Sequence, residues 1–190
     1  MPLEGRAVPE SLPVFRYHPD PVRSGSVEAS HKACKCCGQK RGFVYFGPVY
    51  AEADDLDEAI CPWCIGDGSA AAKFDAYFNN VDGIVGEVPE SVQEEVEKRT
   101  PGYITLQEGE WHACCGDAMA FLMRATEKNL LSREFPKSRS ALMIQLLTVE
   151  GVSSPDAAEF VMTLTKDSDH SAYMFRCLKC GKYRFQVEYP

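Results

Sequence analysis

The sequence contains no apolar run close to the roughly 20 residues that a membrane-spanning helix needs, and its first residues lack the basic-then-apolar layout of a secretory signal peptide. Positive charge is also scarce, because 28 acidic residues face 20 basic ones and the formal net charge is −8. We therefore expect a cytoplasmic protein with no membrane partner. We do not expect nucleic acid as its partner, since binding phosphates requires a basic surface.

Familiar catalytic motifs are missing as well: there is no H-E-x-x-H, no phosphate-binding loop and no G-x-S-x-G. His112 beside Cys114 and Cys115, with Asp117 nearby, offers the residue types of a cysteine nucleophile and its base. One helix cannot align all four, however, and a metal site would use the same side chains. We therefore expect that the protein is not an enzyme.

Cysteine is abundant, with nine residues in 190. Two segments have the form C-x-x-C-G, Cys34 to Gly38 and Cys177 to Gly181, and each is followed by a basic and aromatic run. In such a turn the glycine takes a positive φ that lets the chain fold back into a strand. Because the cytoplasm keeps thiols reduced, this pattern favours zinc over disulfides.

Each C-x-x-C pair supplies two zinc ligands, and a closed structural site needs four. The partner of the first pair is Cys61-Pro62-Trp63-Cys64, which gives a two-pair spacing close to that of a zinc ribbon. The second pair has no further C-x-x-C, and our preferred partner is His112 with Cys115. A Cys114–Cys115 ligand pair remains an alternative. The sequence thus predicts two structural Zn²⁺ ions, with these ligands: Cys34, Cys37, Cys61, Cys64; His112, Cys115, Cys177, Cys180.

Two cysteines, Cys36 and Cys114, are spare in the preferred ligand sets. Another possibility concerns Cys61-Pro62-Trp63-Cys64, whose form is also that of a thiol oxidoreductase at a helix start. Two observations argue against this possibility. Cys34 and Cys37 offer this motif a complementary pair of metal ligands, and no thioredoxin-like βαβ pattern precedes it. His18 lies beside Pro-Asp-Pro, and we interpret it as a turn residue that bonds the backbone and not as a ligand.

The pattern of elements predicts an α+β fold in which zinc-ribbon-like β-hairpin modules at both ends brace a helical middle. Residues 1–11 would be a flexible N-terminus and residues 12–190 one zinc-stabilised domain. That domain would comprise a first zinc-ribbon module (12–80), a mainly helical middle (81–170) and a C-terminal knuckle hairpin (171–190) that packs on 111–117.

Local patterns predict the individual elements. Strands are expected at 12–18 and 41–46, and a hairpin at 171–189. Helices are expected at 70–78, 89–99, 118–131 and 156–165, the third of them capped by Asp117. Phe74, Tyr77 and Phe78 would form one face of the first helix. Residues 141–147 are too few to distinguish a helix from a buried strand.

Several longer motifs carry a family resemblance: residues 12–21 (LPVFRYHPDP), 47–50 (GPVY), 61–70 (CPWCIGDGSA), 100–103 (TPGY), 111–112 (WH) and 115–117 (CGD). In these motifs the chain resembles the CbrC-like family of small bacterial proteins, which is marked by three C-x-x-C motifs. The resemblance covers nearly the whole chain. It implies no activity, but relatives have been proposed as immunity proteins that neutralise toxins delivered between bacteria.

We therefore expect a protein that acts through protein–protein contact, most concretely an immunity protein that occludes a basic toxin such as a nuclease. The acidic run around Asp54, Asp55, Asp57 and Glu58 would meet the basic partner through charge complementarity. An alternative is a nucleic-acid-binding or regulatory zinc ribbon whose aromatic residues, Phe43 and Tyr183 among them, stack on bases. A thiol oxidoreductase is the remaining alternative.

Overall fold

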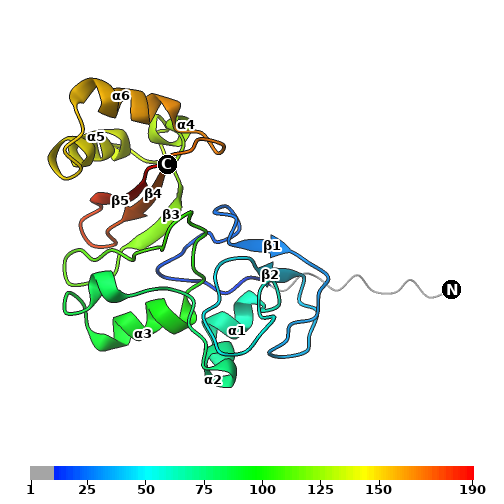
Figure 1. The fold of residues 1–190 in the computed structure, drawn as a ribbon. Helices are drawn as coiled ribbons and strands as arrows, with labels where there is room; N and C mark the ends of the chain where they lie inside the picture. Colours follow the sequence, from blue (N-terminus) through cyan, green and yellow to red (C-terminus); the bar gives the residue numbers. More distant parts are fainter. Residues whose placement is uncertain (1–10) are drawn as a thin grey trace.

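The computed structural model describes residues 11–190, so the expected flexible N-terminus lies outside the described residues apart from Ser11. The described chain has an α+β fold (Figure 1). Its elements, in order, are β1 (Val27–Ala29), β2 (Phe43–Tyr45), α1 (Pro62–Gly66), α2 (Ser69–Phe74), the 3-10 helix η1 (Asp82–Ile84), α3 (Glu90–Arg99), β3 (Ala120–Arg124), α4 (Glu127–Leu130), α5 (Ser138–Thr148), α6 (Ser154–Thr163), β4 (Ser171–Arg176) and β5 (Tyr183–Glu188). No helix in this part of the chain is long and apolar enough to cross a membrane.

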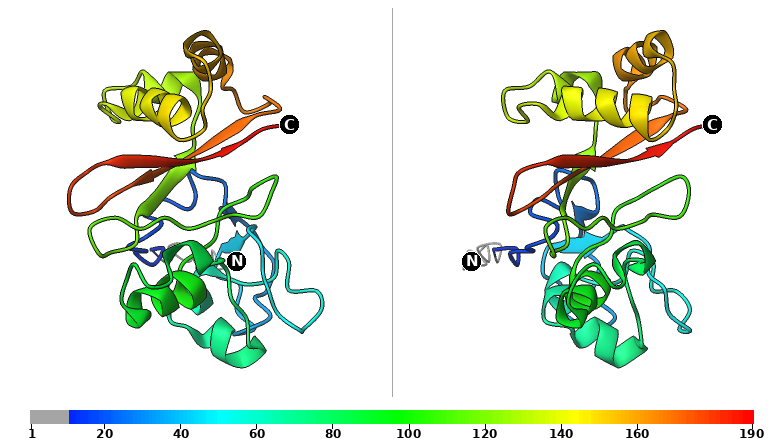
Figure 2. Two further views of the ribbon diagram at one scale, coloured as in Figure 1. Left: turned by 60° about the vertical axis from the view of Figure 1, so that its left-hand side comes forward. Right: turned by 90° about the vertical axis from the view of Figure 1, so that its left-hand side faces the viewer.

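A three-stranded antiparallel sheet of order β3-β4-β5 lies at the centre of the molecule. Side chains of β4 alternate between two buried clusters: Tyr173 and Phe175 pack on one face, and Ala172 and Met174 on the other. Helices α5 and α6 cover the second face, whereas α3 lies on the opposite side of the sheet (Figure 2). The buried sheet therefore separates two cores.

A β-bulge in β3 lets this short strand place side chains in both cores. Phe121 and Met123 are two positions apart, so a regular strand would point them to the same face. The pairing of β3 with β4 shifts register between these two residues. As a result Phe121 packs with Tyr173 and Phe175, while Met123 packs on the side of α5 and α6.

The N-terminal part of the fold is a separate small layer. Strands β1 and β2 pair antiparallel, with Val27 opposite Tyr45, while α1 packs against β2 and α2 packs against α1. A third buried cluster fills this layer and includes Tyr45, Trp63 and three cysteines, Cys34, Cys61 and Cys64. The cysteines are thus part of a packed core and not of an exposed loop.

Several of the expected elements are confirmed. Helix α3 ends at Arg99, directly before Thr100-Pro101, and α6 begins after Ser153, whose side chain caps it. The C-terminal hairpin is present as β4 and β5. The ambiguous segment 141–147 lies inside α5.

Three expectations about local structure are wrong. Residues 12–18 form no strand, and the segment is held instead by its buried side chains Tyr17 and His18 and by one backbone hydrogen bond from Phe121 to Tyr17. Segment 118–131 is not one helix, because β3 occupies 120–124 and only the short α4 follows. Helix α2 ends at Phe74, where Asp75 adopts a left-handed conformation, so Tyr77 and Phe78 do not share its face.

Candidate metal centres

Four cysteines from the first and second C-x-x-C pairs converge in the N-terminal layer. The sulfur atoms of Cys34, Cys37, Cys61 and Cys64 all lie within 4.8 Å of one another. Individual sulfur–sulfur distances are 3.9 Å for Cys34–Cys64, 3.9 Å for Cys37–Cys61 and 3.5 Å for Cys61–Cys64. The structure therefore brings together all four residues that the sequence assigned to the first centre.

The turn that carries the first pair is closed by its backbone. The N–H of Gly38 donates to the carbonyl of Cys34 at 2.7 Å, and the N–H of Cys34 donates to the carbonyl of Gln39 at 2.9 Å. Gly38 has a φ of 74°, as expected for the residue that reverses the chain. This turn lies in the connection between β1 and β2.

The turn at the other end of the chain repeats this pattern. The N–H of Gly181 donates to Cys177 at 3.0 Å, the N–H of Cys177 donates to Lys182 at 2.8 Å, and the φ of Gly181 is 71°. It connects β4 with β5. Each C-x-x-C-G turn therefore joins two antiparallel strands, which explains why the two sequences look alike.

Cys61 and Cys64 are positioned by the start of α1. Cys61 is the residue before the helix, Pro62 occupies its first turn, and Cys64 follows within that turn. The backbone N–H of Cys61 also donates to the sulfur of Cys34 at 3.2 Å. The interaction with the Cys61 side chain lowers the pKa of Cys34 to about 4, so Cys34 favours the thiolate, the form that binds metal, whereas the same interaction raises the pKa of Cys61.

The second group consists of four cysteines, and it corrects the preferred ligand set. Sulfur atoms of Cys114, Cys115, Cys177 and Cys180 lie within 4.8 Å of one another, with 3.7 Å between Cys114 and Cys115 and 3.7 Å between Cys114 and Cys180. Cys114 is thus not a spare cysteine. The structure matches the Cys114–Cys115 alternative and not the Cys3His set.

His112 lies outside this group. Its ring packs edge-on against Phe175, with 4.8 Å between the ring centroids, and its Nε2 atom is buried without a hydrogen-bond partner in the described chain. Burial and the positive charge of Arg184 lower the pKa of His112 to about 4, so its imidazole is neutral at pH 7. Cys114 takes the place expected for His112 in the group, because the chain turns sharply after Cys114.

That sharp turn has a clear backbone signature. Cys115 and Gly116 have φ values of 58° and 66°, and the N–H of Cys114 donates to the carbonyl of Asp117 at 2.9 Å. Two left-handed residues in succession reverse the chain tightly. The turn therefore lets two adjacent cysteines aim their sulfurs at one point, which adjacent residues of a strand or helix do not do.

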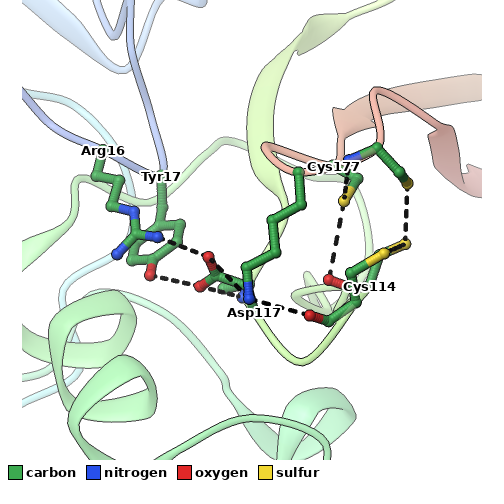
Figure 3. A network of polar contacts seen from close by, with 9 residues as sticks. Arg16, Tyr17, Cys114, Asp117 and Cys177 are labelled. Carbon is green, nitrogen blue, oxygen red and sulfur yellow. Dashed lines mark hydrogen bonds and ion pairs between the residues drawn. The ribbon is translucent and has the colours of Figure 1, made fainter.

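Asp117 is a buried residue at this centre whose role the sequence did not predict. Its carboxylate accepts hydrogen bonds from Tyr17 Oη at 2.8 Å and from Arg16 Nη2 at 2.6 Å (Figure 3). Lys179, from inside the second C-x-x-C, lies 4.0 Å from the same carboxylate. Asp117 therefore connects residues 16–17 to both loops of the second group, and it does not cap a helix.

The sulfur groups fit zinc in chemistry and in spacing. Thiolate is a preferred zinc ligand, and a tetrahedral site with zinc–sulfur bonds of about 2.3 Å places its sulfurs about 3.8 Å apart. The five sulfur–sulfur distances given above span 3.5 to 3.9 Å. These five distances agree with a tetrahedron and are far from the roughly 2.05 Å of a disulfide, and the other sulfur pairs within each group lie within 4.8 Å.

Two further expectations concern side chains outside the groups. Cys36 is not one of the four cysteines of the first group, although its side chain contacts Cys64, and its sulfur lies 3.6 Å from the hydroxyl of Ser69, in agreement with a spare cysteine. His18 bonds the carbonyl of Pro101 through Nδ1 at 2.7 Å, as expected of a residue that bonds the backbone. Neither side chain belongs to a four-cysteine group.

The acidic run lies on the loop between β2 and α1. Asp54, Asp55 and Asp57 are exposed, and Glu58 forms an ion pair with Lys32 at 2.7 Å. Leu56, in the middle of the run, is buried in the first core. The loop is therefore anchored beside the first sulfur group while its carboxylates face solvent.

Comparison with known proteins places the chain in a family. The model of an uncharacterised protein family, UPF0167, matches residues 12–189. The chain belongs to this family. UPF0167 proteins of Mycobacterium bovis and Mycobacterium tuberculosis are each 45% identical over 182 residues, covering 95% of this chain and 95% of the relative. A UPF0167 protein of Pseudomonas aeruginosa is 36% identical over 188 residues, covering 94% and 97%.

These matches carry the UPF0167 name and not the CbrC-like name that the motifs suggested. The family description states no activity. No solved structure matches the chain significantly. What this UPF0167 protein does must therefore be argued from its own geometry.

Proposed function

We propose that this UPF0167 protein binds two structural zinc ions and acts, without catalysis of its own, by binding another protein. The observation that supports the zinc ions is the pair of four-cysteine groups, whose sulfur spacing matches a tetrahedral site. Four thiolates fill the coordination shell of zinc and leave no open position for a substrate or for water. This arrangement favours a structural role over a catalytic one.

A zinc-ribbon-like description of both modules is part of this proposal. It is supported by the two C-x-x-C-G turns, each of which joins a pair of antiparallel strands and presents two sulfurs. The third and fourth ligands come from a helix start in the first module and from a tight turn in the second. Each zinc ion would therefore link two segments that are distant in the sequence.

The protein-binding role is supported by charge and by exposure. The net charge is −8, and three carboxylates on one loop, those of Asp54, Asp55 and Asp57, are exposed. Such a surface attracts a basic protein and orients it during encounter. Neutralisation of a toxin is the most specific form of this proposal, and only the family resemblance supports it.

Native mass spectrometry tests the zinc proposal. The folded protein should exceed the mass of the denatured chain by two zinc ions. A single ion would contradict one of the two centres. A chain without metal and lighter than expected by several hydrogens would contain disulfides, and would favour the thiol oxidoreductase alternative.

Paired substitutions test the ligand sets. Cys114→Ser should reduce the zinc content from two ions to one, whereas His112→Gln should keep both. In the first centre Cys37→Ser should lose one ion, and Cys36→Ser is its matched control because Cys36 lies outside the group. Loss of zinc in His112→Gln with retention in Cys114→Ser would restore the Cys3His set.

Charge reversal tests the partner surface. A basic protein that co-purifies with the chain from its source cells should be lost when Asp54, Asp55 and Asp57 are replaced by lysine. The control is the replacement of Glu94 and Glu97, two acidic residues on α3, by lysine. Equal binding by both variants would exclude the acidic loop as the contact surface.

A further inference from the structure

A cavity of about 1200 Å³ lies between α5 and the beginning of β5, beside the second sulfur group. One face of α5 forms one wall through Ala141, Ile144 and Thr148, which are spaced as neighbours on a helix. Residues 180–185 form the opposite wall. Pockets for small molecules usually have volumes of roughly 300 to 1000 Å³, so this space is large enough for one. The zinc proposal makes no use of it.

The lining contains three cationic side chains, Lys137, Lys182 and Arg184, and also Cys180, which the zinc proposal makes an anionic thiolate. Aspartate and glutamate are absent from the lining. Within residues 11–190 the side chains of these three cations make no hydrogen bond and no ion pair. This local positive charge contrasts with the net charge of −8 of the whole chain, and a concave surface of one sign attracts ligands of the other.

Two buried polar atoms in the lining residues lack partners. Nε2 of His112 and the hydroxyl of Tyr183 are inaccessible to solvent and make no hydrogen bond in the described chain. Buried polar atoms are nearly always satisfied, and leaving one unpaired lowers stability. Because both atoms are closed off from solvent, a ligand reaches them only when neighbouring side chains move.

Part of the remaining lining is apolar and lies beside the polar side chains of Ser140, Gln145 and Thr148. Ile144 and Val149 are 60% and 74% exposed, which is high for large aliphatic side chains. The ring of Tyr183 and the side chain of Phe185 lie on the other wall. The cavity thus combines a cationic part with an apolar part, as small-molecule sites commonly do.

We propose that this cavity binds a small organic anion with an apolar body. Lys137, Lys182 and Arg184 would hold its carboxylate, sulfonate or phosphate group through charge-assisted hydrogen bonds. The body would lie against Ile144 and Val149, whose side chains are exposed on the cavity wall. This site is independent of the proposed protein-binding loop, which lies in the N-terminal layer.

Fluorescence titration with 8-anilinonaphthalene-1-sulfonate tests the proposal on the zinc-loaded full chain. This probe has an aromatic body and one anionic group, and its emission rises in an apolar site. Saturable binding of one molecule per chain is expected. N-phenyl-1-naphthylamine has the same body without the charge and should bind about 10-fold more weakly, since one charge-assisted contact is then lost. Inorganic sulfate should compete only at far higher concentration.

Variants locate the site. Arg184→Gln and Lys182→Gln should each weaken binding about 5-fold, whereas Lys98→Gln on α3 should leave it unchanged. Backbone NMR shifts on addition of the sulfonate should be confined to α5 and residues 180–185. The zinc content of each variant, by mass spectrometry, verifies that it is folded.

Three results would overturn the proposal. They are absence of saturable binding, equal affinity for the charged and neutral probes, and shifts outside α5 and residues 180–185. The last would indicate that the sulfonate binds another apolar surface of the protein.

Discussion

At the scale of single residues, the burial of His18 lowers its pKa and makes the stability of the fold depend on pH. The ring is fully buried between the carbonyl of Pro101 and the hydroxyl of Ser24, and its edge packs on Phe121. Burial lowers the pKa of His18 to about 4, compared with about 6.5 in an unfolded chain. The folded protein therefore keeps this imidazole neutral.

This difference predicts a pH dependence of stability. Below pH 6.5 the unfolded chain binds a proton at His18 that the folded chain does not, so the free energy of unfolding falls as the pH decreases from about 6.5 to 4. The loss is up to about 3 kcal/mol. Urea denaturation of the wild type and of His18→Gln at pH 7.5 and pH 5 measures it.

The comparison with the variant is needed because acid also protonates zinc-binding thiolates. That effect is common to both proteins, so the difference between their pH slopes isolates His18. The wild type should lose more stability than His18→Gln between the two pH values. Equal slopes would contradict the buried neutral imidazole.

Removal of the buried Asp117 carboxylate should also destabilise the fold. Asp117→Asn removes a buried charge that accepts hydrogen bonds from Tyr17 and Arg16. Hydrogen bonds to charged groups contribute roughly 1.5 to 3 kcal/mol, so we expect a loss of about 2 kcal/mol in the free energy of unfolding. Chemical denaturation measures this loss.

Asp167→Asn is the matched control, since the Asp167 side chain is exposed and makes no hydrogen bond. It should change stability by less than about 0.5 kcal/mol. Similar values for the two variants would show that the Asp117 network does not stabilise the fold.

At the scale of elements, the sequence predicted those with strong local signals. Helix α3 has proline before its first residue and basic residues in its last turn, and α6 has serine and proline at its start. Likewise, the C-x-x-C-G turns are local structures whose glycines require a positive φ. These parts could be predicted because neighbouring residues determine them.

Strand β3 could not be predicted in this way. Met119, Leu122 and Met123 have helical spacing, but the strand is buried on both faces and therefore shows no alternation of polar and apolar residues. Its bulge further disturbs the period. Pairing with β4, about 50 residues later, decides its conformation, and no local pattern contains that information.

The second ligand set was missed for a related reason. Spacing suggested His112 with Cys115 because His-x-x-Cys resembles the other pairs. The grouping of Cys114 with Cys115 in the structure depends on the left-handed conformations of Cys115 and Gly116, and cysteine is a residue that rarely adopts positive φ. The first set was predictable because both of its pairs are regular C-x-x-C motifs.

Helix α6 allows a test of capping with two neighbouring serines. Ser153 accepts a hydrogen bond from the N–H of Asp156 and donates one to its carboxylate at 2.6 Å. Ser153→Ala should reduce the free energy of unfolding by about 1 kcal/mol. Ser154→Ala, one position later, should have little effect because alanine is a good helix former. Equal effects in thermal unfolding would contradict the assignment of Ser153 as the cap.

At the scale of the whole molecule, the two proposed zinc centres differ in their accessibility. Three of the four cysteines of the first group are buried, compared with only Cys177 in the second. We therefore predict that a chromogenic chelator such as 4-(2-pyridylazo)resorcinol removes zinc in two phases, the second centre first. The Cys114→Ser variant should lack the fast phase and keep the slow one.

Removal of the slowly released zinc should also unfold the N-terminal layer, since the free energy of metal binding is part of the free energy of folding at such a site. Circular dichroism recorded during chelation measures this. Loss of the slow phase in Cys114→Ser, or release of both ions at one rate, would contradict the predicted order.

The order of the elements along the chain has a consequence for synthesis on the ribosome. Cys34 and Cys64 of the first group are 30 positions apart, whereas Cys114 and Cys180 of the second are 66 apart. Strand β3 likewise has β4 as its only neighbour in the sheet. A nascent chain can therefore complete its first centre early, but it carries two unpaired thiols of the second centre, an unpaired strand and two uncovered helices until the final hairpin emerges.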